Sequence, residues 1–437
     1  MGEQVSKQKI GNDSFLVFVF AVGIMISPDT LVMLGNFFGK TGNIGFFLII
    51  FSLIIYLILL SQYKHFFIFS SESLSDIKML KKTVGTTLVF FLFFVKIIAV
   101  IFLSTGLLVS SGFVFNEVFL YWFPNFGFAF ILLGLLLGLQ FLPVKVALYS
   151  QVAFCVISIS GLLVLIISGI MQADQLIDLK PGDIDYSTNG FGLGTYFLPL
   201  LFFIGFEMGF PVWNNSDQNV PQKNSILFMA VIFMGMLFIL WGYVLLLYIP
   251  MEKLVDTSIP HMIVAKNILG APGRFIMGVI VISGSLAAVN ALFTAISQQG
   301  SMLLQIKMLP GNIKISKIII LSLTLIIAGM MAGGMAGAEE LETFIRASLI
   351  LWLISYSMIS IFYIFILSKS NKRYHTNFLL KIVISVMCLL ILGITILMLT
   401  IMDDKPILIL KFLGVALFIS LIPGFILMLR DAKTFKK

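Results

Sequence analysis

The sequence predicts an all-α polytopic membrane protein with about twelve transmembrane helices, arranged as a 5+5 inverted repeat with two extra helices at the C-terminus. Three observations support this prediction. Of the 437 residues, 59% are hydrophobic and only 11% are charged, less than half the charged share of soluble domains. The apolar residues occur in blocks of roughly 20, the length of a helix that crosses the hydrocarbon core of a bilayer. Glycine and proline interrupt the first and sixth of these blocks.

The apolar blocks form two groups of five, followed by a final pair. They cover residues 14–37, 43–63, 83–111, 122–142, 145–171, 192–213, 224–249, 272–299, 315–336, 343–367, 378–402 and 406–429. None has the short alternating pattern of β-barrel strands, so each is expected to be a helix. The predicted divisions are a cytoplasmic tail (1–13), a first five-helix repeat (14–171), a second repeat (192–367), helices 11 and 12 (378–429) and a cytoplasmic tail (430–437). The amphipathic segment 64–82 is expected to lie on the membrane surface.

Basic residues predict the orientation of the chain. If the N-terminus is cytoplasmic, eighteen Lys and Arg residues fall in cytoplasmic loops and tails, and six fall in the loops on the other side. An excess of this kind is typical of the cytoplasmic face. We therefore expect both termini in the cytoplasm, and the short tails favour a bacterial inner membrane.

Other residue types argue against several classes of function. The two cysteines, Cys155 and Cys388, lie inside apolar blocks, which argues against a disulfide framework or a zinc site. The histidines at 65, 261 and 375 lie far apart in loops, and the chain has no P-loop or recognisable catalytic triad. We expect no enzyme activity and no cofactor beyond a coupling ion, H⁺ or Na⁺. The net charge of +8 is attributed to cytoplasmic loops, so no nucleic-acid partner is expected.

The interruptions lie in the middle of their predicted spans. The first block reads FAVGIMISPDTLVM, with Gly23 and Pro28 followed by Asp29, and the sixth reads FFIGFEMGFP, with Glu207 just after Gly205. Both residue types disturb the helical hydrogen-bond ladder, and proline also removes a donor. Backbone groups freed inside a bilayer need other partners, so such breaks persist where they line a cavity.

The spacing of the breaks predicts the repeat. Gly23 and Gly205 lie about 182 residues apart (205 − 23), and each break opens a run of five predicted helices. An odd number of spans makes the two copies cross the membrane in opposite directions. This is the pattern of inverted-repeat transporters, whose substrates bind at the discontinuous helices.

Four segments resemble signatures of the amino acid–polyamine–organocation (APC) superfamily of permeases, which have a LeuT-like fold. IMISPDTL resembles the family's first helix and FFIGFE its sixth. SDQNVPQKN resembles the loop that follows the sixth helix, and AISQQGSMLLQIKMLP resembles the end of helix 8. The matches occur in family order and cover about residues 14–367, with helices 11 and 12 beyond them.

The resemblance implies a substrate site at the two breaks. Amides after Gly23 would hold a substrate carboxylate, carbonyls around Phe203 to Gly205 would hold an α-amino group, and Phe206 would be a gate. The sequence departs from the family pattern at the first break, where the bulky Val22 precedes Gly23. The substrate-binding residues implied in this way are Val22, Gly23, Ile24, Ser27, Phe203, Gly205, Phe206 and Glu207.

Ionisable residues inside the predicted spans are candidates for proton or charge coupling. Lys96 lies at the centre of the third block, where a charge costs on the order of 2.5 kcal/mol or more. We expect it to point into the bundle and pair with Glu207 or Asp29. The pair is either a static structural one or a device in which Lys96 replaces a coupling cation or binds a substrate carboxylate. Glu207 and Asp29 are either capping carboxylates or groups that carry a proton or contact the substrate.

The resemblance also implies a candidate sodium site, because hydroxyl groups of helix 8 contribute to one beside the first break in sodium-coupled relatives. Ser283 and Ser285 in the eighth block would be its ligands, and helix packing is the alternative role for these serines.

These observations predict a secondary active transporter that moves an amino acid or related amine by alternating access, as a proton-coupled carrier or an exchanger. The alternatives are a non-transporting receptor that senses a small ligand with the same fold, and a sodium-coupled symporter. The expected partners are a small-molecule substrate and the lipid bilayer. The identity of the substrate, symport versus antiport, the coupling ion and the oligomeric state stay open.

Overall fold

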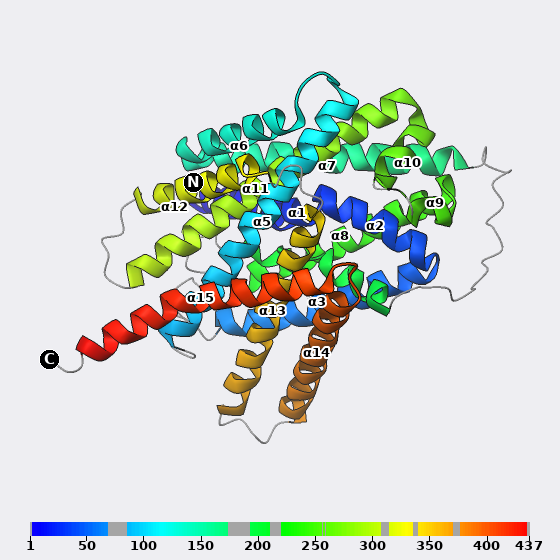
Figure 1. Cartoon of the computed structure of the whole chain (residues 1–437). Coiled ribbons are helices and arrows are strands. Elements are labelled where there is room, and N and C mark those ends of the chain that lie inside the picture. Colours follow the sequence, from blue (N-terminus) through cyan, green and yellow to red (C-terminus); the bar gives the residue numbers. More distant parts are fainter. Residues whose placement is uncertain are drawn as a thin grey trace.

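The computed structural model of the chain describes residues 2–68, 85–173, 193–209, 220–255, 257, 259–306, 314–334, 340–369 and 376–434. Regular structure within these ranges consists of helices (Figure 1). Most of the predicted surface segment, 69–82, lies outside the described residues, as do the end of the predicted sixth span and the first part of the loop after it, 210–219.

The first half of the chain contains six α-helices and two 3₁₀ segments. They are α1 (Gly2–Met25), α2 (Pro28–Thr41), α3 (Ile44–Ile68), α5 (Thr86–Val118), α6 (Asn125–Phe141), α7 (Val144–Met171), η2 (Leu193–Leu201) and η3 (Phe206–Gly209). The second half follows with α8 (Val220–Tyr248), α9 (Met251–Val255), α10 (Pro260–Leu269), α11 (Ala271–Ile306), α12 (Lys314–Ala332), α13 (Leu341–Lys369), α14 (Thr376–Ile401) and α15 (Pro406–Thr434).

Nine helices of the described ranges are long and apolar enough to cross a membrane, and the bent pair of α1 and α2 makes a tenth. Two shorter apolar segments, Asn125–Phe141 and Gly194–Gly209, occupy the positions of the predicted fourth and sixth spans. The chain is therefore an integral membrane protein with many transmembrane helices. The total of twelve spans, their inverted repeat and the orientation stay predictions.

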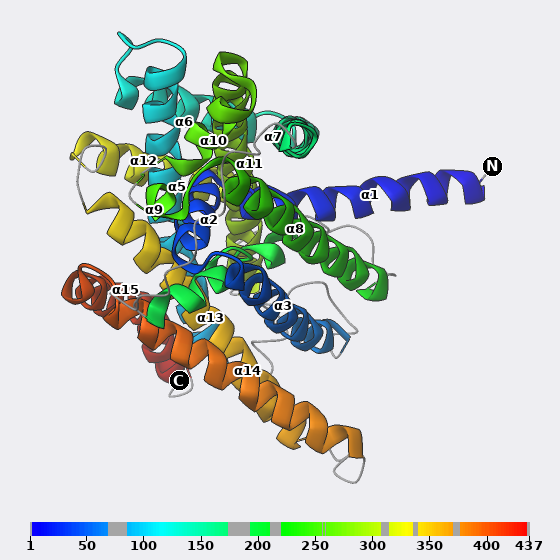
Figure 2. The same ribbon diagram turned by 90° about the vertical axis from the view of Figure 1, so that its right-hand side faces the viewer.

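Helices α1 and α5 each pack against several other elements of the bundle. Helix α5 packs against α6, α11, α13 and α15, while α1 contacts α7, α8, α11 and η3. Helix α15 runs along the bundle beside α5 and α13 (Figure 1). The N-terminal part of α1 projects from the body (Figure 2). The first residues, expected as a tail at 1–13, belong to α1 from Gly2 onward.

Two short helices, α9 and α10, lie between α8 and α11, where the sequence analysis placed a loop. Pro260 begins α10, as is common at the first helical position, and Gly270 with φ +67° ends it. Both helices pack against α2. The ring of Pro260 contacts Gly35 and the side chain of Leu254 contacts Gly39, positions where a side chain on α2 would collide.

Candidate functional site

The first break lies later than expected. Helix α1 continues through Gly23 to Met25, α2 begins at Pro28, and the two are bent by 54°. Pro28 has no N–H to continue the ladder and is well suited to the first position of a new helix. Ser27 caps α2: its Oγ accepts from the Thr30 amide at 3.4 Å and lies 3.0 Å from the Thr30 hydroxyl.

Gly23 therefore does not open the break, and the expectation of free amides after it is wrong. Gly23 is helical, and an added Cβ would collide with the Gln151 amide and lie 2.9 Å from Cys155 Sγ. Its role is close packing of α1 against α7 and α11. Val22 is likewise a helical core residue, with no exposed surface.

The second break is centred on Gly205, as predicted. Gly205 has φ +92°, a conformation that side chains other than glycine rarely adopt, and it joins the 3₁₀ segments η2 and η3. Polar side chains satisfy the backbone here: Tyr56 Oη donates to the Leu200 carbonyl at 2.6 Å, and the Gly205 amide donates to Tyr356 Oη at 3.0 Å. The Leu200 carbonyl and the Gly205 amide are therefore already hydrogen-bonded within the protein.

The two breaks meet directly. The side chain of Ile24, near the end of α1, lies against the Cα of Gly205, and a Cβ at that glycine would collide with it. α1 and η3 are packed together. Residues 181 positions apart in sequence (205 − 24) are thus in contact.

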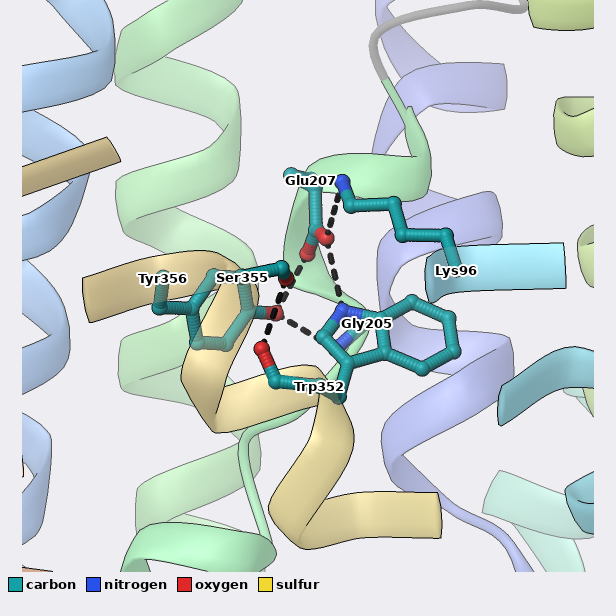
Figure 3. Close-up of polar contacts among 6 residues, drawn as sticks. All are labelled: Lys96, Gly205, Glu207, Trp352, Ser355 and Tyr356. Carbon is teal, nitrogen blue, oxygen red and sulfur yellow. Dashed lines mark hydrogen bonds and ion pairs between the residues drawn. The ribbon is translucent and has the colours of Figure 1, made fainter. Parts of the chain in front are cut away.

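Glu207 is the centre of a buried hydrogen-bond cluster (Figure 3). Its Oε1 accepts from Lys96 Nζ at 3.0 Å and from Trp352 Nε1 at 2.8 Å, and its Oε2 accepts from Tyr356 Oη at 2.5 Å. The Glu207 side chain is fully buried and that of Lys96 is 9% exposed. Glu207 and Asp29 were the two carboxylates expected as partners of Lys96, and in the structure Glu207 forms the ion pair. The cluster joins η3 to α5 and α13.

Trp352 and Tyr356 of α13 both donate to Glu207, and the sequence analysis did not single them out as its partners. Their spacing of four residues, one turn of a helix, was the signal that they share a face. Nothing in the sequence pointed that face towards the carboxylate, because the packing of α13 beside η3 is tertiary information.

Phe203 and Phe206 lie in an aromatic cluster rather than over a cavity. Phe203 packs against Tyr56 at a ring-centroid distance of 5.3 Å, and Phe206 packs against Tyr56, Tyr63 and Tyr356 at 5.5 to 5.6 Å. Both phenylalanines are fully buried. In this conformation Phe206 fills the core beside Glu207, and the expected gate over the substrate is not seen.

A small pocket lies between the two breaks, on the α2 side. Its volume is about 10 Å³, room for about one water molecule, and α2, α5, α13, the end of α1 and the η2 end of the second break contribute its walls. Asp29 is one of its residues, and its Oδ2 is buried without a hydrogen-bond partner among the described residues. The full lining consists of Ile24, Ser27, Asp29, Thr30, Met33, Leu103, Leu201, Ile204 and Leu349.

The two candidate sodium serines face different helices. Ser283 Oγ lies 2.7 Å from Ser158 Oγ of α7, whereas Ser285 Oγ donates to the Leu107 carbonyl of α5 at 3.0 Å and accepts from Ser111 Oγ at 2.6 Å. Each hydroxyl is therefore engaged in a separate interhelical contact, and the pair does not converge on one site.

A second buried polar network lies on the α1 side of the break. Asn290 Nδ2 donates to Gln151 Oε1 at 2.8 Å, and Gln140 Nε2 donates to Asn290 Oδ1 at 2.8 Å. Cys155 Sγ lies 3.3 Å from the Val19 carbonyl and links α7 to α1. The sequence analysis did not identify these amides as a network. The network joins α6, α7 and α11, and Cys155 ties α7 to α1.

Within the described ranges, no group of three or more His, Cys, Asp or Glu side chains is placed to hold a metal ion.

No protein-family model and no curated protein sequence matches the chain. Solved structures of similar shape do exist. The Eremococcus coleocola manganese transporter, in complex with an aromatic bis-isothiourea substituted compound, matches with a TM-score of 0.62 and 13% identity, covering 97% of this chain and 95% of that one. Two single-residue variants of that transporter match with TM-scores of 0.57 and 0.56, at 12% and 13% identity, each covering 97% of this chain and 94% of theirs.

At this level of identity the likeness shows the fold, which this chain shares with that solved manganese transporter. The resemblance to APC permeases stays a prediction at the level of family.

Proposed function

We propose that this chain is a secondary active transporter that carries a small solute with an amino group across the membrane by alternating access. The observation that carries the proposal is the contact between the two broken spans, where Ile24 lies on Gly205 beside a pocket. Unwound backbone at the middle of a bundle is typical of transporter binding sites. The fold shared with a solved membrane transporter supports the same class of function.

The contacts on the two sides of the breaks support an alternating mechanism. On one side α9 and α10 pack against α2, and on the other the Gln140–Asn290–Gln151 network and Cys155 close α7 and α11 around α1. If the contacts of α9 and α10 with α2 broke while those around α1 held, or the reverse, the pocket would open to one side of the membrane at a time. The bend between α1 and α2 gives the two half-helices room to move separately.

Glu207 and Lys96 are the proposed coupling device. In this conformation the carboxylate accepts three hydrogen bonds and balances the Lys96 charge, so η3 is held to α5 and α13. Protonation of Glu207 would remove that balance and convert an acceptor oxygen into a donor. The lysine would then be an uncompensated buried charge, which is strongly unfavourable. Proton uptake would thus release η3 from its neighbours.

The solute is proposed to be organic. The solved structure is named as a manganese transporter, and that name concerns that protein. In this chain the described residues contain no group of three or more His, Cys, Asp or Glu side chains that could hold a metal ion. The pocket is lined mainly by aliphatic side chains. A sodium-coupled mechanism has less support, because Ser283 and Ser285 contact different helices.

Reconstitution into liposomes tests the proposal. Purified protein is expected to take up radiolabelled amino acids or amines, with a rate that depends on an imposed pH gradient and not on sodium. A receptor with the same fold would bind a ligand and move nothing. The Glu207→Gln variant should lose the pH dependence.

Glu117→Gln is the matched control, because Glu117 is 44% exposed and pairs with Arg274 away from the breaks. Full uptake with an unchanged pH profile in Glu207→Gln would refute the coupling role.

A further inference from the structure

A pair of buried polar side chains joins α3 to α13, close to the Glu207 cluster. Ser360 Oγ of α13 donates to Gln62 Oε1 of α3 at 2.7 Å. Gln62 is 1% exposed and Ser360 is fully buried. The Gln62 Nε2 is also buried, and no acceptor among the described residues bonds it. Residues 56–63 of α3 and 356–363 of α13 form this interface, named the α3–α13 seam below.

The unpartnered amide marks a place for a water molecule. A buried N–H without an acceptor is costly, and an ordered water commonly satisfies such a group. A water that accepts from Gln62 Nε2 can also donate to the Ser360 hydroxyl oxygen, which has two lone pairs. Polar groups buried inside membrane spans often mark the pathways of ions and protons.

Tyr356 connects this place to Glu207. Its Oη donates to Glu207 Oε2 at 2.5 Å and accepts from the Gly205 amide at 3.0 Å. A tyrosine hydroxyl has one proton and two lone pairs, so one lone pair is left to accept from a water. Ser360 lies one turn further along α13, about 6 Å along the axis, which one water spans with two hydrogen bonds of about 2.8 Å each.

Helices α3 and α13 run in the same direction along the seam. The ring of Tyr56 lies 6.0 Å from that of Tyr356, and Gln62 is bonded to Ser360, so residue numbers increase together on both helices. Tyr363, which is 4% exposed, follows Ser360 at the next turn of α13. The seam therefore leads from Glu207 towards the side of the membrane on which both helices end, which the sequence predicts to be the cytoplasm.

Aliphatic side chains occupy the opposite direction, towards the pocket. Each of the three elements that hold the Glu207 cluster contributes one of them to the pocket lining: Ile204 of the second break, Leu103 of α5 and Leu349 of α13. These side chains offer no hydrogen bond to a water. In this conformation the polar groups that continue from Glu207 are therefore those of the seam.

We infer that the α3–α13 seam is the route of protons between Glu207 and the side of the membrane on which α3 and α13 end, with Gln62 and Ser360 as positioning residues for the water that carries them. The inference rests on the proposed function, because it supplies the path for the proton that Glu207 binds there.

The transfer conserves protons and charge. A proton that arrives on the water as H₃O⁺ passes to Tyr356 Oη, while Tyr356 passes its own proton to Glu207 Oε2. The hydronium becomes water, the carboxylate becomes a carboxylic acid, and the tyrosine is neutral before and after the step. Release of the proton follows the same bonds in reverse.

The fluorescence of Trp352 can report proton binding by Glu207, because its indole N–H donates to Glu207 Oε1 at 2.8 Å. The full-length protein in nanodiscs is mixed rapidly from alkaline to acidic buffer, and tryptophan fluorescence is recorded in a stopped-flow instrument. The component of the signal that is absent from both Trp352→Phe and Glu207→Gln belongs to protonation of Glu207. No solute is needed for this measurement.

The double variant Gln62→Met with Ser360→Ala tests the seam. It should slow the Glu207 component by roughly tenfold or more, as expected when a charged intermediate loses a hydrogen bond, and leave its amplitude unchanged. Thermal unfolding should be unchanged or shifted upward, because both partners of the bond and the unpartnered amide are removed together. A purely structural pair would leave the rate unchanged.

Single variants provide the controls. Ser360→Thr keeps the hydroxyl and should keep the wild-type rate, and Gln62→Met alone should also slow the signal, which keeps the test open if the double variant does not fold. Ser420→Ala is the matched control, because Ser420 of α15 is fully buried and donates to the Ala416 carbonyl of its own helix. It should leave the rate unchanged.

An unchanged rate in the double variant would overturn the inference, as would equal slowing by Ser420→Ala. The proposed function fails in distinguishable ways. If no fluorescence component depends on Glu207, this residue takes up no proton, and its coupling role is refuted together with the route. If the component is present but independent of the seam, only the route is refuted. If the seam controls the rate but liposomes take up no solute, transport is refuted and the route stands.

Discussion

The strongest quantitative prediction concerns the ion pair between Lys96 and Glu207. Lys96→Met removes the positive partner of a fully buried carboxylate and leaves Glu207 with donors from Trp352 and Tyr356 alone. Removing one member of a buried pair costs about 3–5 kcal/mol, because the other charge is left uncompensated. Glu207→Gln should cost a similar amount, because Lys96 then lies charged in the bundle.

The double variant Lys96→Met with Glu207→Gln should be far less destabilised than the sum of the two single changes. No charge remains in it, and the glutamine can still accept from Trp352 and bond to Tyr356. We expect a coupling energy of several kcal/mol between the two sites, opposite in sign to the single effects. The free energy of unfolding of each variant can be measured by denaturant titration in mixed micelles.

The exposed pair of Arg274 and Glu117 is the control. Its atoms lie 2.6 Å apart, but its side chains are 35% and 44% exposed, so the same cycle there should give about 0–1 kcal/mol. If the Lys96 and Glu207 changes add to within about 0.5 kcal/mol, the two residues do not interact in the folded protein, and the inference that their ion pair holds η3 to α5 is wrong.

Three further predictions follow from single positions. Gly205→Ala should destabilise the protein by about 2–4 kcal/mol, from the positive φ and a collision with α1, whereas Gly134→Ala, where an added Cβ meets nothing, should be near neutral by thermal unfolding. Cys155, buried between α7 and α1, should react with N-ethylmaleimide faster during substrate turnover than at rest, with the second cysteine replaced by serine; equal rates would count against opening on that side. Burial lowers the pKa of His261 on α10 to about 4 from 6.5, so between these values the unfolded segment binds more protons than the folded one. The docking of α10 should therefore weaken by up to about 3 kcal/mol as pH falls through that range, seen as faster hydrogen exchange, and a pH-independent exchange equilibrium would contradict it.

The two carboxylates at the breaks have opposite environments. Glu207 accepts from three donors and is not one of the residues that line the pocket, whereas Asp29 lines the pocket and has an oxygen without a partner within the described residues. A carboxylate whose oxygens all have hydrogen-bond partners is suited to holding elements together. A carboxylate with an oxygen that lacks a partner is suited to binding a ligand. The sequence analysis placed both residues in one coupling group, because their position in a span was all that could be compared.

The sequence predicted the position of one break correctly and that of the other only approximately. Gly205 was identified correctly, since a positive φ in the middle of a span leaves glycine as the preferred residue. Gly23 was misassigned, because a glycine can also serve close helix packing, and the two uses cannot be distinguished without knowing what lies opposite. Pro28 was the more reliable signal, since a proline ends the preceding ladder whatever surrounds it.

The sequence by itself determined the features that follow from local chemistry and from the bilayer. Its apolar blocks required membrane helices, its glycine and proline interruptions required discontinuous spans, and Lys96 at mid-span required a carboxylate partner. Only the tertiary structure decided which carboxylate that is, that Trp352 and Tyr356 complete its shell, and that Asp29 is left facing a pocket. The physical reason is that helix periodicity states which residues share a face, whereas the packing of one helix against another selects what that face meets.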